Sequence, residues 1–257
     1  MFGIIVLSDH RYVKLGKENS WFVKEVERMI VHFYLVRHGQ TELNRRRRLQ
    51  GITDSPLTKK GIAMAKKLGD DLHNVEFTAI YTSDLKRTQK TAQYILEQNN
   101  KKKPPIKTAP GLRELNFGNY EEMKNRKLVP TVLRKIGLRK IIAAFRQQQH
   151  VAAVTNLFKI MDTATQIENA QQLNQRMTRT LTEIAYEYKD KQGEVNILIV
   201  AHAIVLSVFI EGLKGDVPML LLKNARVSKV DFQDGVFNII SINQKKLNND
   251  RSEKNEE

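Results

Sequence analysis

The sequence predicts an α/β fold, namely a three-layer α/β/α sandwich with a mostly parallel central sheet and a small helical cap insertion. Short apolar runs rich in β-branched and aromatic residues alternate with longer segments of helical periodicity, which is typical of parallel sheets with crossover helices. Two of these runs, 31–36 and 195–200, are each followed within two residues by a histidine. Ligands of open α/β sheets bind at the carboxyl ends of the strands, so these two ends mark a candidate site.

The composition excludes several kinds of chemistry. The 257 residues include no cysteine, so the chain has no disulfide, no thiolate nucleophile and no thiolate metal ligand. This composition suits a reducing compartment, and we expect the protein to act in the cytoplasm. No apolar run approaches the length of about 20 residues that a membrane-spanning helix needs.

Positive charge is concentrated in one part of the chain. The sequence carries 43 lysines and arginines against 28 acidic residues, which gives a net charge of +15. Between residues 101 and 146 there are thirteen lysines and arginines and three glutamates, and 45–48 is a further basic run. Such clusters favour phosphorylated substrates, nucleic acid or an anionic membrane surface. A solvated basic face without any partner is the alternative.

The first half of the chain contains three predicted strands and two predicted helices. The run 31–36 is the first strand, and a helix follows with Thr58 as its N-cap and with Ile62, Ala65 and Leu68 on its apolar face. Residues 77–81 form the second predicted strand and 85–98 the second helix. A short strand is expected at 106–108.

The second half is expected to begin with helices and to end with a hairpin. Residues 121–165 are helical in character, with an apolar stripe made of Leu138, Ile141, Ile142 and Phe145. A further amphipathic helix is expected at 171–188, and the strand 195–200 leads into an apolar helix that ends near Gly212. The pair Asp234-Gly235 is a preferred hairpin turn between two β-type runs at 226–232 and 236–242.

These elements suggest one domain with flanking segments outside it. We expect the domain to cover 29–243, with a cap inserted at 116–165 and a disordered polar tail at 244–257. Residues 1–28 are expected to lie outside the fold, and Met29 is expected to be the true initiator, since it would be a natural start for the first strand. A purine-rich ribosome-binding sequence read in this frame would encode residues such as Lys24-Glu25-Val26, which lie just before Met29. A genuine N-terminal helix around 21–30 is the alternative.

Three strand ends carry charged or titratable groups. They are Arg37 and His38 after the first strand, the segment 83–87 after the second, and His202 after the strand 195–200. If the strands are parallel, these groups meet at one edge of the sheet, where two arginines and two histidines would repel one another without an anion among them. Arginine matches phosphate oxygens in a bidentate manner, so a phosphoryl group is the expected occupant.

The order and spacing of these motifs resemble the histidine phosphatase superfamily, which includes phosphoglycerate mutases and phosphomonoesterases. The resemblance covers about residues 31–243. It rests on Leu35-Val36-Arg37-His38-Gly39-Gln40-Thr41 with Asn44, Gln50-Gly51, Asp54-Ser55-Pro56-Leu57-Thr58, Ser83-Asp84-Leu85-Lys86-Arg87-Thr88, Leu112-Arg113-Glu114 with Phe117-Gly118, and Val200-Ala201-His202. The resemblance implies a metal-independent phosphomonoester hydrolase that needs no cofactor and acts on a small phosphorylated metabolite.

Carried over position by position, the resemblance implies that His38 is the nucleophile and becomes phosphohistidine. Arg37, Arg87 and His202 would hold the phosphoryl oxygens, and Glu114 would donate a proton to the leaving group. The expected substrate-binding residues are Thr41, Asn44, Gln50, Gly51 and Ala203. The chemistry agrees with these roles, because phosphoryl transfer needs an in-line nucleophile and neutralisation of the charge on the phosphoryl oxygens.

The sequence departs from the family pattern at several places. Ala201 and Ala203 flank the second histidine where the family usually has serine and glycine, and Glu122 and Ile167 each stand where glycine is frequent. Glu168-Asn169 with Arg176 resembles a weaker family pattern in the cap. These departures leave the substrate poorly defined.

Several other functions compete with the phosphatase. A phosphoglycerate mutase is the nearest, but 121–165 lacks the Arg-Arg-Ser-Tyr segment by which the mutases resemble one another. A non-catalytic phosphate-binding regulatory module is the second alternative. The chain keeps all five residues to which the resemblance gives a catalytic role, which argues against this alternative; they are Arg37, His38, Arg87, Glu114 and His202.

The sequence also offers two possible macromolecular partners. The basic run 45–48 could contact nucleic acid, but it lacks the aromatic side chains on which bases stack, so we expect no nucleic-acid partner. We likewise expect no membrane partner: the amphipathic stretch 133–146 would suit a membrane surface, but a cap helix packed on the core is favoured.

Overall fold

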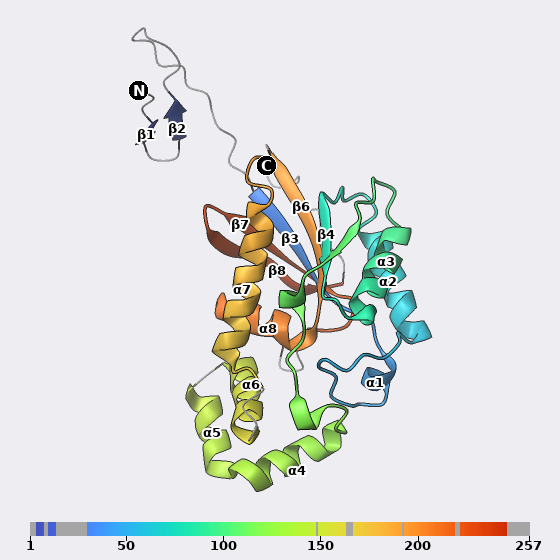
Figure 1. The fold of residues 1–257 in the computed structure, drawn as a ribbon, viewed down its shortest axis with the longest axis vertical. Helices are drawn as coiled ribbons and strands as arrows, with labels where there is room; N and C mark the ends of the chain where they lie inside the picture. Colours follow the sequence, from blue (N-terminus) through green and yellow to red (C-terminus); the bar gives the residue numbers. More distant parts are fainter. Residues whose placement is uncertain are drawn as a thin grey trace, which may run out of the picture.

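The structure is a computed structural model that describes residues 4–7, 10–13, 30–147, 149–162, 167–191, 193–218 and 222–245. A six-stranded sheet lies at its centre, with helices on both faces and a helical cap at one end (Figure 1). The strands of this sheet are β3 (Ile30–Arg37), β4 (Ala79–Thr82), β5 (Ile106–Thr108), β6 (Glu194–Ala201), β7 (Val227–Gln233) and β8 (Val236–Gln244).

The sheet is mixed and mostly parallel, as the sequence predicts. Its strand order is β5-β4-β6-β3-β7-β8; the first four strands are parallel to one another, and β7 runs antiparallel to both β3 and β8. The register pairs Arg37 with Ala201 and Thr82 with Val200. The carboxyl ends of β3, β4 and β6 therefore lie side by side, and the three predicted groups of site residues follow directly after them.

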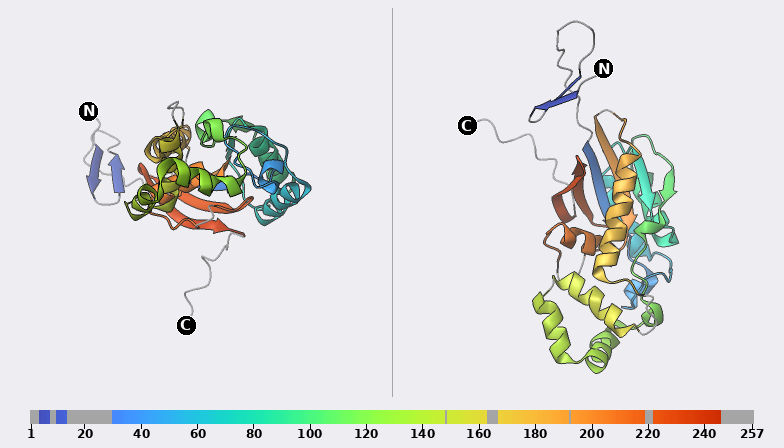
Figure 2. Two further views of the ribbon diagram at one scale, coloured as in Figure 1. Left: turned by 90° about the horizontal axis from the view of Figure 1, so that it is seen from below. Right: turned by 60° about the vertical axis from the view of Figure 1, so that its left-hand side comes forward.

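Each face of the sheet packs against its own helices, which makes three layers (Figure 2). Helices α2 (Lys59–Asp71) and α3 (Lys86–Glu97) cover one face, and α7 (Ala170–Tyr186) and α8 (Ala203–Gly212) cover the other. Alternate residues of β3 enter the two cores: Phe33 and Leu35 pack with α7 and α8, whereas Tyr34 and Val36 pack with α2 and α3. The continuous apolar run that predicted a buried strand thus reflects burial on both faces.

Local sequence signals explain where these elements begin and turn. The Thr58 side chain accepts a hydrogen bond from the Gly61 N–H and caps α2 as predicted. Asp234 and Gly235 adopt φ angles of +51° and +83°, the left-handed conformation that a tight hairpin turn needs. Strand β4 begins two residues later than the predicted strand 77–81, because Phe77 is buried ahead of the strand and its hydrophobicity does not mark the start of pairing.

The cap consists of three helices at the end of the molecule where the site lies (Figure 1). They are α4 (Asn125–Ile136), α5 (Leu138–Gln147) and α6 (His150–Met161), and a short α1 (Glu42–Arg45) precedes them in the chain. Helix α6 buries one face in the core, but the predicted apolar stripe of α5 is divided. Ile141 packs against the core, whereas Leu138, Ile142 and Phe145 are exposed. The expected packing of the whole stripe on the core is therefore wrong for these three residues.

The predicted domain limits fall largely outside the described residues. Strands β1 (Ile4–Leu7) and β2 (His10–Val13) pair with each other in a separate two-stranded sheet. The alternative N-terminal helix at 21–30 lies almost entirely outside what the structure describes. The predicted tail 244–257 starts one residue too early, because Gln244 is the last residue of β8, and 246–257 lie outside the described residues. The leader and the rest of the tail remain predictions. Among the described helices, none has both the length and the apolar character needed to cross a bilayer.

Candidate active site

His38 lies directly after β3, and its ring is held in one tautomer. Its backbone N–H donates to the Ala201 carbonyl at 3.0 Å, which continues the β3–β6 pairing one residue into the turn. Its Nδ1 lies 2.8 Å from the Gly39 carbonyl oxygen. A carbonyl oxygen can only accept, so Nδ1 carries the proton and the lone pair is on Nε2. Burial, with the charges of Arg87 and Arg37, holds the pKa of His38 well below its usual range, so the ring is neutral at pH 7.

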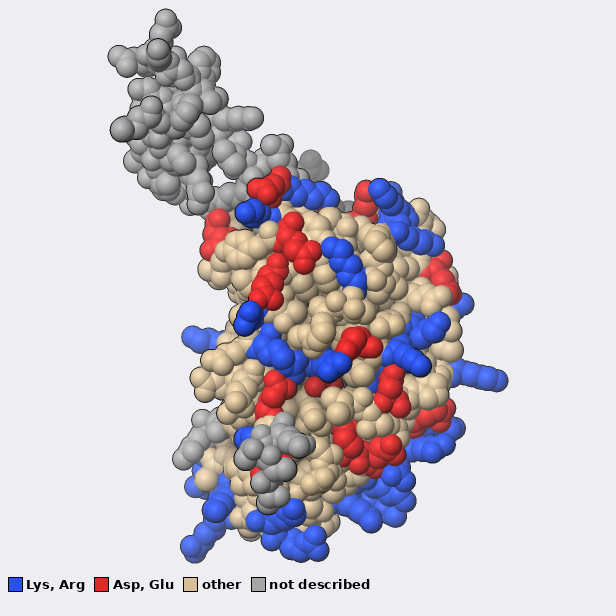
Figure 3. Space-filling model, viewed as in Figure 1, with Lys and Arg blue, Asp and Glu red and all other residues tan. Residues whose placement is uncertain are grey.

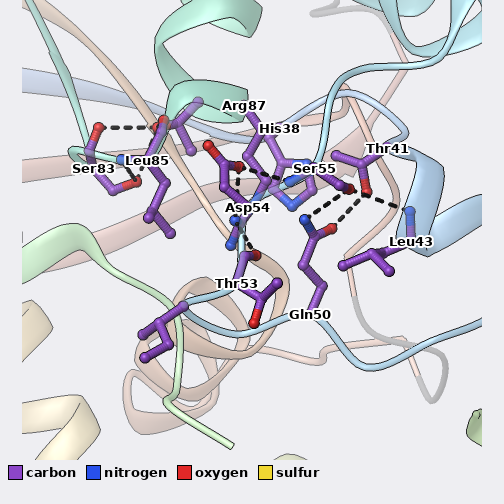
Figure 4. A network of polar contacts seen from close by, with 12 residues as sticks. His38, Thr41, Leu43, Gln50, Thr53, Asp54, Ser55, Ser83, Leu85 and Arg87 are labelled. Atoms are coloured by element: carbon purple, nitrogen blue, oxygen red, sulfur yellow. Dashed lines mark hydrogen bonds and ion pairs between the residues drawn. The ribbon is translucent and has the colours of Figure 1, made fainter. Parts of the chain in front are cut away.

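Arg87 lies in the first turn of α3 and is the most deeply buried cation of the site. Its Nη1 donates to the Thr53 carbonyl and to Asp54 Oδ1, at 3.0 and 3.2 Å. Its Nη2 donates to the Gly51 carbonyl at 2.6 Å. Figure 4 shows the contacts of this guanidinium with Thr53 and Asp54 as dashed lines. The Nε N–H is buried without a partner, which leaves one donor for an anionic ligand.

His202 joins the ends of β6 and α8 to Arg87. Its Nδ1 accepts from Arg87 Nη2 at 3.0 Å, so the proton is on Nε2, which donates to Ser83 Oγ at 2.8 Å. The rings of His202 and His38 lie 5.3 Å apart, centre to centre. Burial, followed by the charge of Arg87, lowers the pKa of His202 well below its usual range. Both histidines are therefore neutral, which removes the repulsion that four cations would create.

Arg37 is the second cation at this edge of the sheet. Its Nη1 donates to the Leu222 carbonyl at 2.6 Å, and its buried Nε has no partner. Burial lowers its pKa to about 10, and the Glu114 charge partly opposes that shift, so Arg37 remains charged at neutral pH. Unsatisfied guanidinium N–H groups on two neighbouring arginines are costly unless a ligand accepts from them. The chemistry of this donor set matches a phosphoryl group.

Glu114 is buried at the N-terminus of α8. Its Oε1 accepts from the backbone N–H groups of Leu115 and Val205, and its Oε2 accepts from that of Ile204. Burial raises its pKa, whereas these three hydrogen bonds lower it. A carboxyl group has about four acceptor positions, so one position on Oε2 remains for a proton. The side chain thus combines a capping role with a pKa that burial raises.

Two ion pairs hold the backbone that leads to Glu114. Arg176 pairs with Glu168 through two hydrogen bonds of 2.8 and 2.7 Å, and its Nη1 donates to the carbonyls of Gly111 and Arg113. The Arg113 Nε donates to Asp84 Oδ1 at 2.7 Å. The weak cap pattern of Glu168 and Arg176 in the sequence therefore corresponds to a real ion pair, and this pair supports the loop that carries Glu114.

The five residues expected to bind substrate have local partners in the structure. Thr41 caps α1, and its Oγ1 donates to Gln50 Oε1 at 2.5 Å, while the Asn44 side chain closes the same capping box (Figure 4 shows Thr41 and Gln50). The Gly51 carbonyl accepts from Arg87, and Ala203 is buried as the first residue of α8. The structure therefore gives each of them a structural role, and contact with substrate remains a prediction.

Sequence reasoning missed the structural roles of three residues near the site. Asn224 Nδ2 donates to the His38 carbonyl at 2.9 Å and to Asn44 Oδ1 at 3.3 Å, although it lies 186 residues away in the chain. Thr91 Oγ1 accepts from the Gly39 N–H at 3.0 Å. The third residue is Glu121, whose carboxylate accepts from the Gly51 N–H at 3.1 Å. Hydrophobic periodicity and strand-end position give no signal for any of them.

Glu121 holds the loop that supplies the acceptors for Arg87. Its carboxylate accepts from the backbone N–H groups of Gly51, Ile52, Thr53 and Phe117, at 3.0 to 3.2 Å. The carbonyls of Gly51 and Thr53 in turn accept from Arg87. The following residue, Glu122, has a φ angle of +58°, which explains why glycine is frequent at its position in the family.

We predict that Glu121→Gln lowers kcat/KM roughly 10- to 100-fold, because an amide NH₂ cannot accept from these N–H groups and the loop behind Arg87 shifts. The matched control is Glu122→Gln, an exposed neighbour with the same change of charge. Inorganic phosphate should inhibit the Glu121 variant more weakly than it inhibits the control. Equal phosphate inhibition of the two variants would contradict a positioning role for Glu121.

The described residues contain no cluster of three or more histidine, aspartate or glutamate side chains that could hold a metal ion. The charges around His38 are instead those of Arg37 and Arg87. Two neutral histidines, two arginines with buried Nε groups and a buried carboxyl group thus lie together at one sheet edge, an arrangement whose chemistry suits phosphoryl transfer.

The chain belongs to the histidine phosphatase superfamily, because residues 33–245 match the sequence profile described as "Histidine phosphatase superfamily (branch 1)". It is 30% identical over 215 residues to the "Adenosylcobalamin/alpha-ribazole phosphatase" of Escherichia coli (strain K12), which covers 84% of this chain and 92% of that protein. It is also 30% identical over 209 residues to the "Probable phosphoglycerate mutase GpmB" of Erwinia tasmaniensis, covering 79% of this chain and 86% of the relative.

A solved structure shows the same fold. The crystal structure of phosphoglycerate mutase from Bacillus anthracis str. Sterne superimposes with a TM-score of 0.76 at 29% sequence identity, and the match covers 86% of this chain and 96% of that one. The predicted family and the predicted α/β class are thus confirmed. The named relatives include both phosphatases and mutases, so family membership establishes an enzyme class without identifying the substrate.

Proposed function

We propose that the chain is a phosphomonoester hydrolase that acts on a small phosphorylated metabolite through a phosphohistidine at His38, without a metal ion or other cofactor. The observation that carries this proposal is the hydrogen bond from His38 Nδ1 to the Gly39 carbonyl, which leaves the Nε2 lone pair of a neutral ring next to two buried guanidinium groups. The absence of cysteine fits action in the cytoplasm.

In the first half of the reaction, the His38 Nε2 lone pair attacks phosphorus and the bond from phosphorus to the leaving oxygen breaks. Arg37 and Arg87 stabilise the charge on the phosphoryl oxygens, His202 orients the Arg87 guanidinium through its Nδ1, and protonated Glu114 gives its proton to the departing alkoxide. In the second half, the Glu114 carboxylate takes a proton from water as the water oxygen attacks phosphorus. The phosphorus–nitrogen bond then breaks, and its electron pair returns to Nε2.

Phosphoglycerate mutation is the second candidate, because several relatives carry that name. A mutase must rebind its phosphorylated product and return the phosphoryl group, whereas a hydrolase gives the group to water. The cap offers a point against the mutase, since 121–165 lacks the Arg-Arg-Ser-Tyr segment expected for reading the carboxylate of phosphoglycerate. Release of inorganic phosphate and transfer between hydroxyl groups are separate measurements, so one panel distinguishes the two activities.

The test is a panel of phosphorylated metabolites assayed for phosphate release with and without EDTA. We predict an essentially unchanged turnover number in EDTA, because the two arginines supply the positive charge that a metal ion supplies in other phosphoryl-transfer sites. Pre-treatment with EDTA followed by Mg²⁺ or Mn²⁺ provides the control. A loss of turnover that either ion restores would contradict metal independence, and isomerisation of phosphoglycerate without phosphate release would favour the mutase.

A further inference from the structure

The two outer helices of the cap carry positive charge only. Helices α4 and α5 with Gly137 between them span 23 residues, 125–147, and contain no aspartate or glutamate. Their seven basic side chains are all exposed: Arg126, Lys127, Arg134, Lys135, Arg139, Lys140 and Arg146. Figure 3 shows Lys and Arg side chains gathered at the lower end of the molecule, where the cap lies in this view. These two helices therefore carry charge of one sign only.

The same two helices also expose large apolar side chains. Of the ten large hydrophobic residues that are exposed in the described chain, five lie on α4 and α5, with exposed fractions of 41% to 64%. They are Val129, Leu133, Leu138, Ile142 and Phe145. Exposed apolar residues scattered singly are normal in proteins, but concentration within two helices marks an interaction surface.

On α5 the apolar and basic side chains are arranged around the helix in a regular way. Leu138, Ile142 and Phe145 are spaced by four and three residues, so they line one side of the helix. At 100° per residue, Arg139 and Arg146 lie along one border of this stripe. The opposite border, with Ile141, packs against the protein core. An apolar stripe bordered by arginines is typical of helices that lie in a membrane interface.

We propose that α4 and α5 form a surface that docks the enzyme onto an anionic membrane. A bilayer with acidic headgroups satisfies both features, since the apolar stripe enters the interface while the basic side chains contact the headgroups. The helices lie on the membrane and do not span it. This proposal departs from the expectation from sequence that the protein has no membrane partner, and it does not depend on the proposed function.

Charge, side-chain type and size argue against three other possible partners for this surface. Two copies that met through it would bring fourteen basic side chains together without an acidic partner from either α4 or α5, so self-association is disfavoured. Nucleic acid would match the charge, but four of the five exposed apolar side chains are aliphatic and only Phe145 among them could stack on a base. A phosphorylated metabolite is too small to cover five apolar side chains on two helices. The membrane is the occupant that accounts for both kinds of side chain.

The experiment is sedimentation of the full chain with vesicles of phosphatidylcholine alone or of phosphatidylcholine with phosphatidylserine. We expect binding only when phosphatidylserine is present, and weaker binding at 0.5 M salt, because the electrostatic part of the attraction is screened. Arg139→Gln combined with Arg146→Gln should weaken binding about 25-fold, at roughly fivefold for each charge near an anionic surface. Ile142→Ala should weaken it several-fold through loss of buried apolar area.

Matched controls distinguish binding through this surface from nonspecific binding to vesicles. Lys59→Gln combined with Lys60→Gln removes the same net charge from exposed positions on α2. Ile240→Ala makes the same side-chain change at a position on β8 that is exposed to a similar degree, 49% against 42% for Ile142. Both controls should bind vesicles like the parent chain. Circular dichroism and thermal unfolding of every variant show that the fold is retained.

Three outcomes would overturn the proposal. The first is no binding to vesicles containing phosphatidylserine at low salt. The second is equal loss of binding in the cap variants and in the α2 and β8 controls, which would mean that net charge or general apolarity drives the association. The third is a dimer, measured by light scattering, that the cap variants dissociate, since the surface would then belong to a second copy. Phosphatase activity decides none of these outcomes, so failure of this proposal is distinguishable from failure of the proposed function.

Discussion

His38→Ala is expected to lower turnover on the order of 10⁴- to 10⁶-fold, the range for loss of a covalent nucleophile whose surrounding binding groups remain. The replacement removes the imidazole whose free Nε2 is proposed to attack phosphorus. His202 cannot substitute for it in this geometry, because Ser83 and Arg87 engage its two ring nitrogens. The arginines should still bind phosphate, so the variant is expected to keep its affinity for inorganic phosphate.

Rapid quenching with labelled substrate should trap phosphohistidine in the parent protein, acid-labile and absent from the His38 variant. The Gly39 carbonyl holds the proton on Nδ1, so the phosphoryl group is expected on Nε2, and phosphorus NMR distinguishes the two isomers. His32→Ala is the matched control, because His32 is also buried on β3 but pairs with Asp231 away from the site. An adduct that survives His38→Ala, or one on Nδ1, would contradict this assignment.

Glu114→Gln is expected to lower the rate of phosphohistidine formation roughly 10²- to 10⁴-fold on alkyl phosphates, the usual range for loss of a positioned general acid. An alkoxide leaving group is strongly basic and needs the proton, whereas a nitrophenolate leaves without one. In the same variant the rate of phosphohistidine formation should therefore fall much less on nitrophenyl phosphate. Single-turnover measurement observes this step directly, so slow dephosphorylation of His38 cannot hide the difference between the two substrates.

The pH dependence gives a second measure of the same role. Burial raises the pKa of Glu114, so the protonated form persists to higher pH than for an exposed glutamate. Activity that requires this proton is fully present below the raised pKa and falls as pH rises through it. On alkyl phosphates the parent enzyme should show this alkaline fall, and Glu114→Gln should lack it.

A control is needed because Glu114 also caps α8. Glu211 is a buried glutamate that accepts from the backbone N–H groups of Val151 and Ala152 at the start of α6. Glu211→Gln should therefore cost stability in a similar way without producing the contrast between leaving groups. Equal loss on both substrates in Glu114→Gln would mean that Glu114 supports the loop only, and the proton donor would have to be sought elsewhere.

The sequence determined the features that neighbouring residues encode. Short apolar runs, helical apolar patterns, Thr58 as a cap and Asp234-Gly235 as a turn predicted the elements to within a few residues. Because parallel strands share an edge, His38, Arg87 and His202 could be brought together without coordinates. Each of these inferences depends on backbone geometry that repeats in every protein, and for that reason the local pattern is enough.

Only the tertiary structure decided which distant groups touch. Three contacts at the site depend on loop conformations, which no periodic pattern encodes. They are the hydrogen bond from Asn224 to the His38 carbonyl, the hydrogen bonds of Glu121 to the loop behind Arg87, and those of Glu114 to the N-terminus of α8. The cap shows the same limit, because the stripe with Ile142 is as apolar as a buried helix face. Whether it is covered depends on where the neighbouring helices lie, so amphipathicity predicts that a face needs an apolar partner, and tertiary packing decides whether the protein itself provides one.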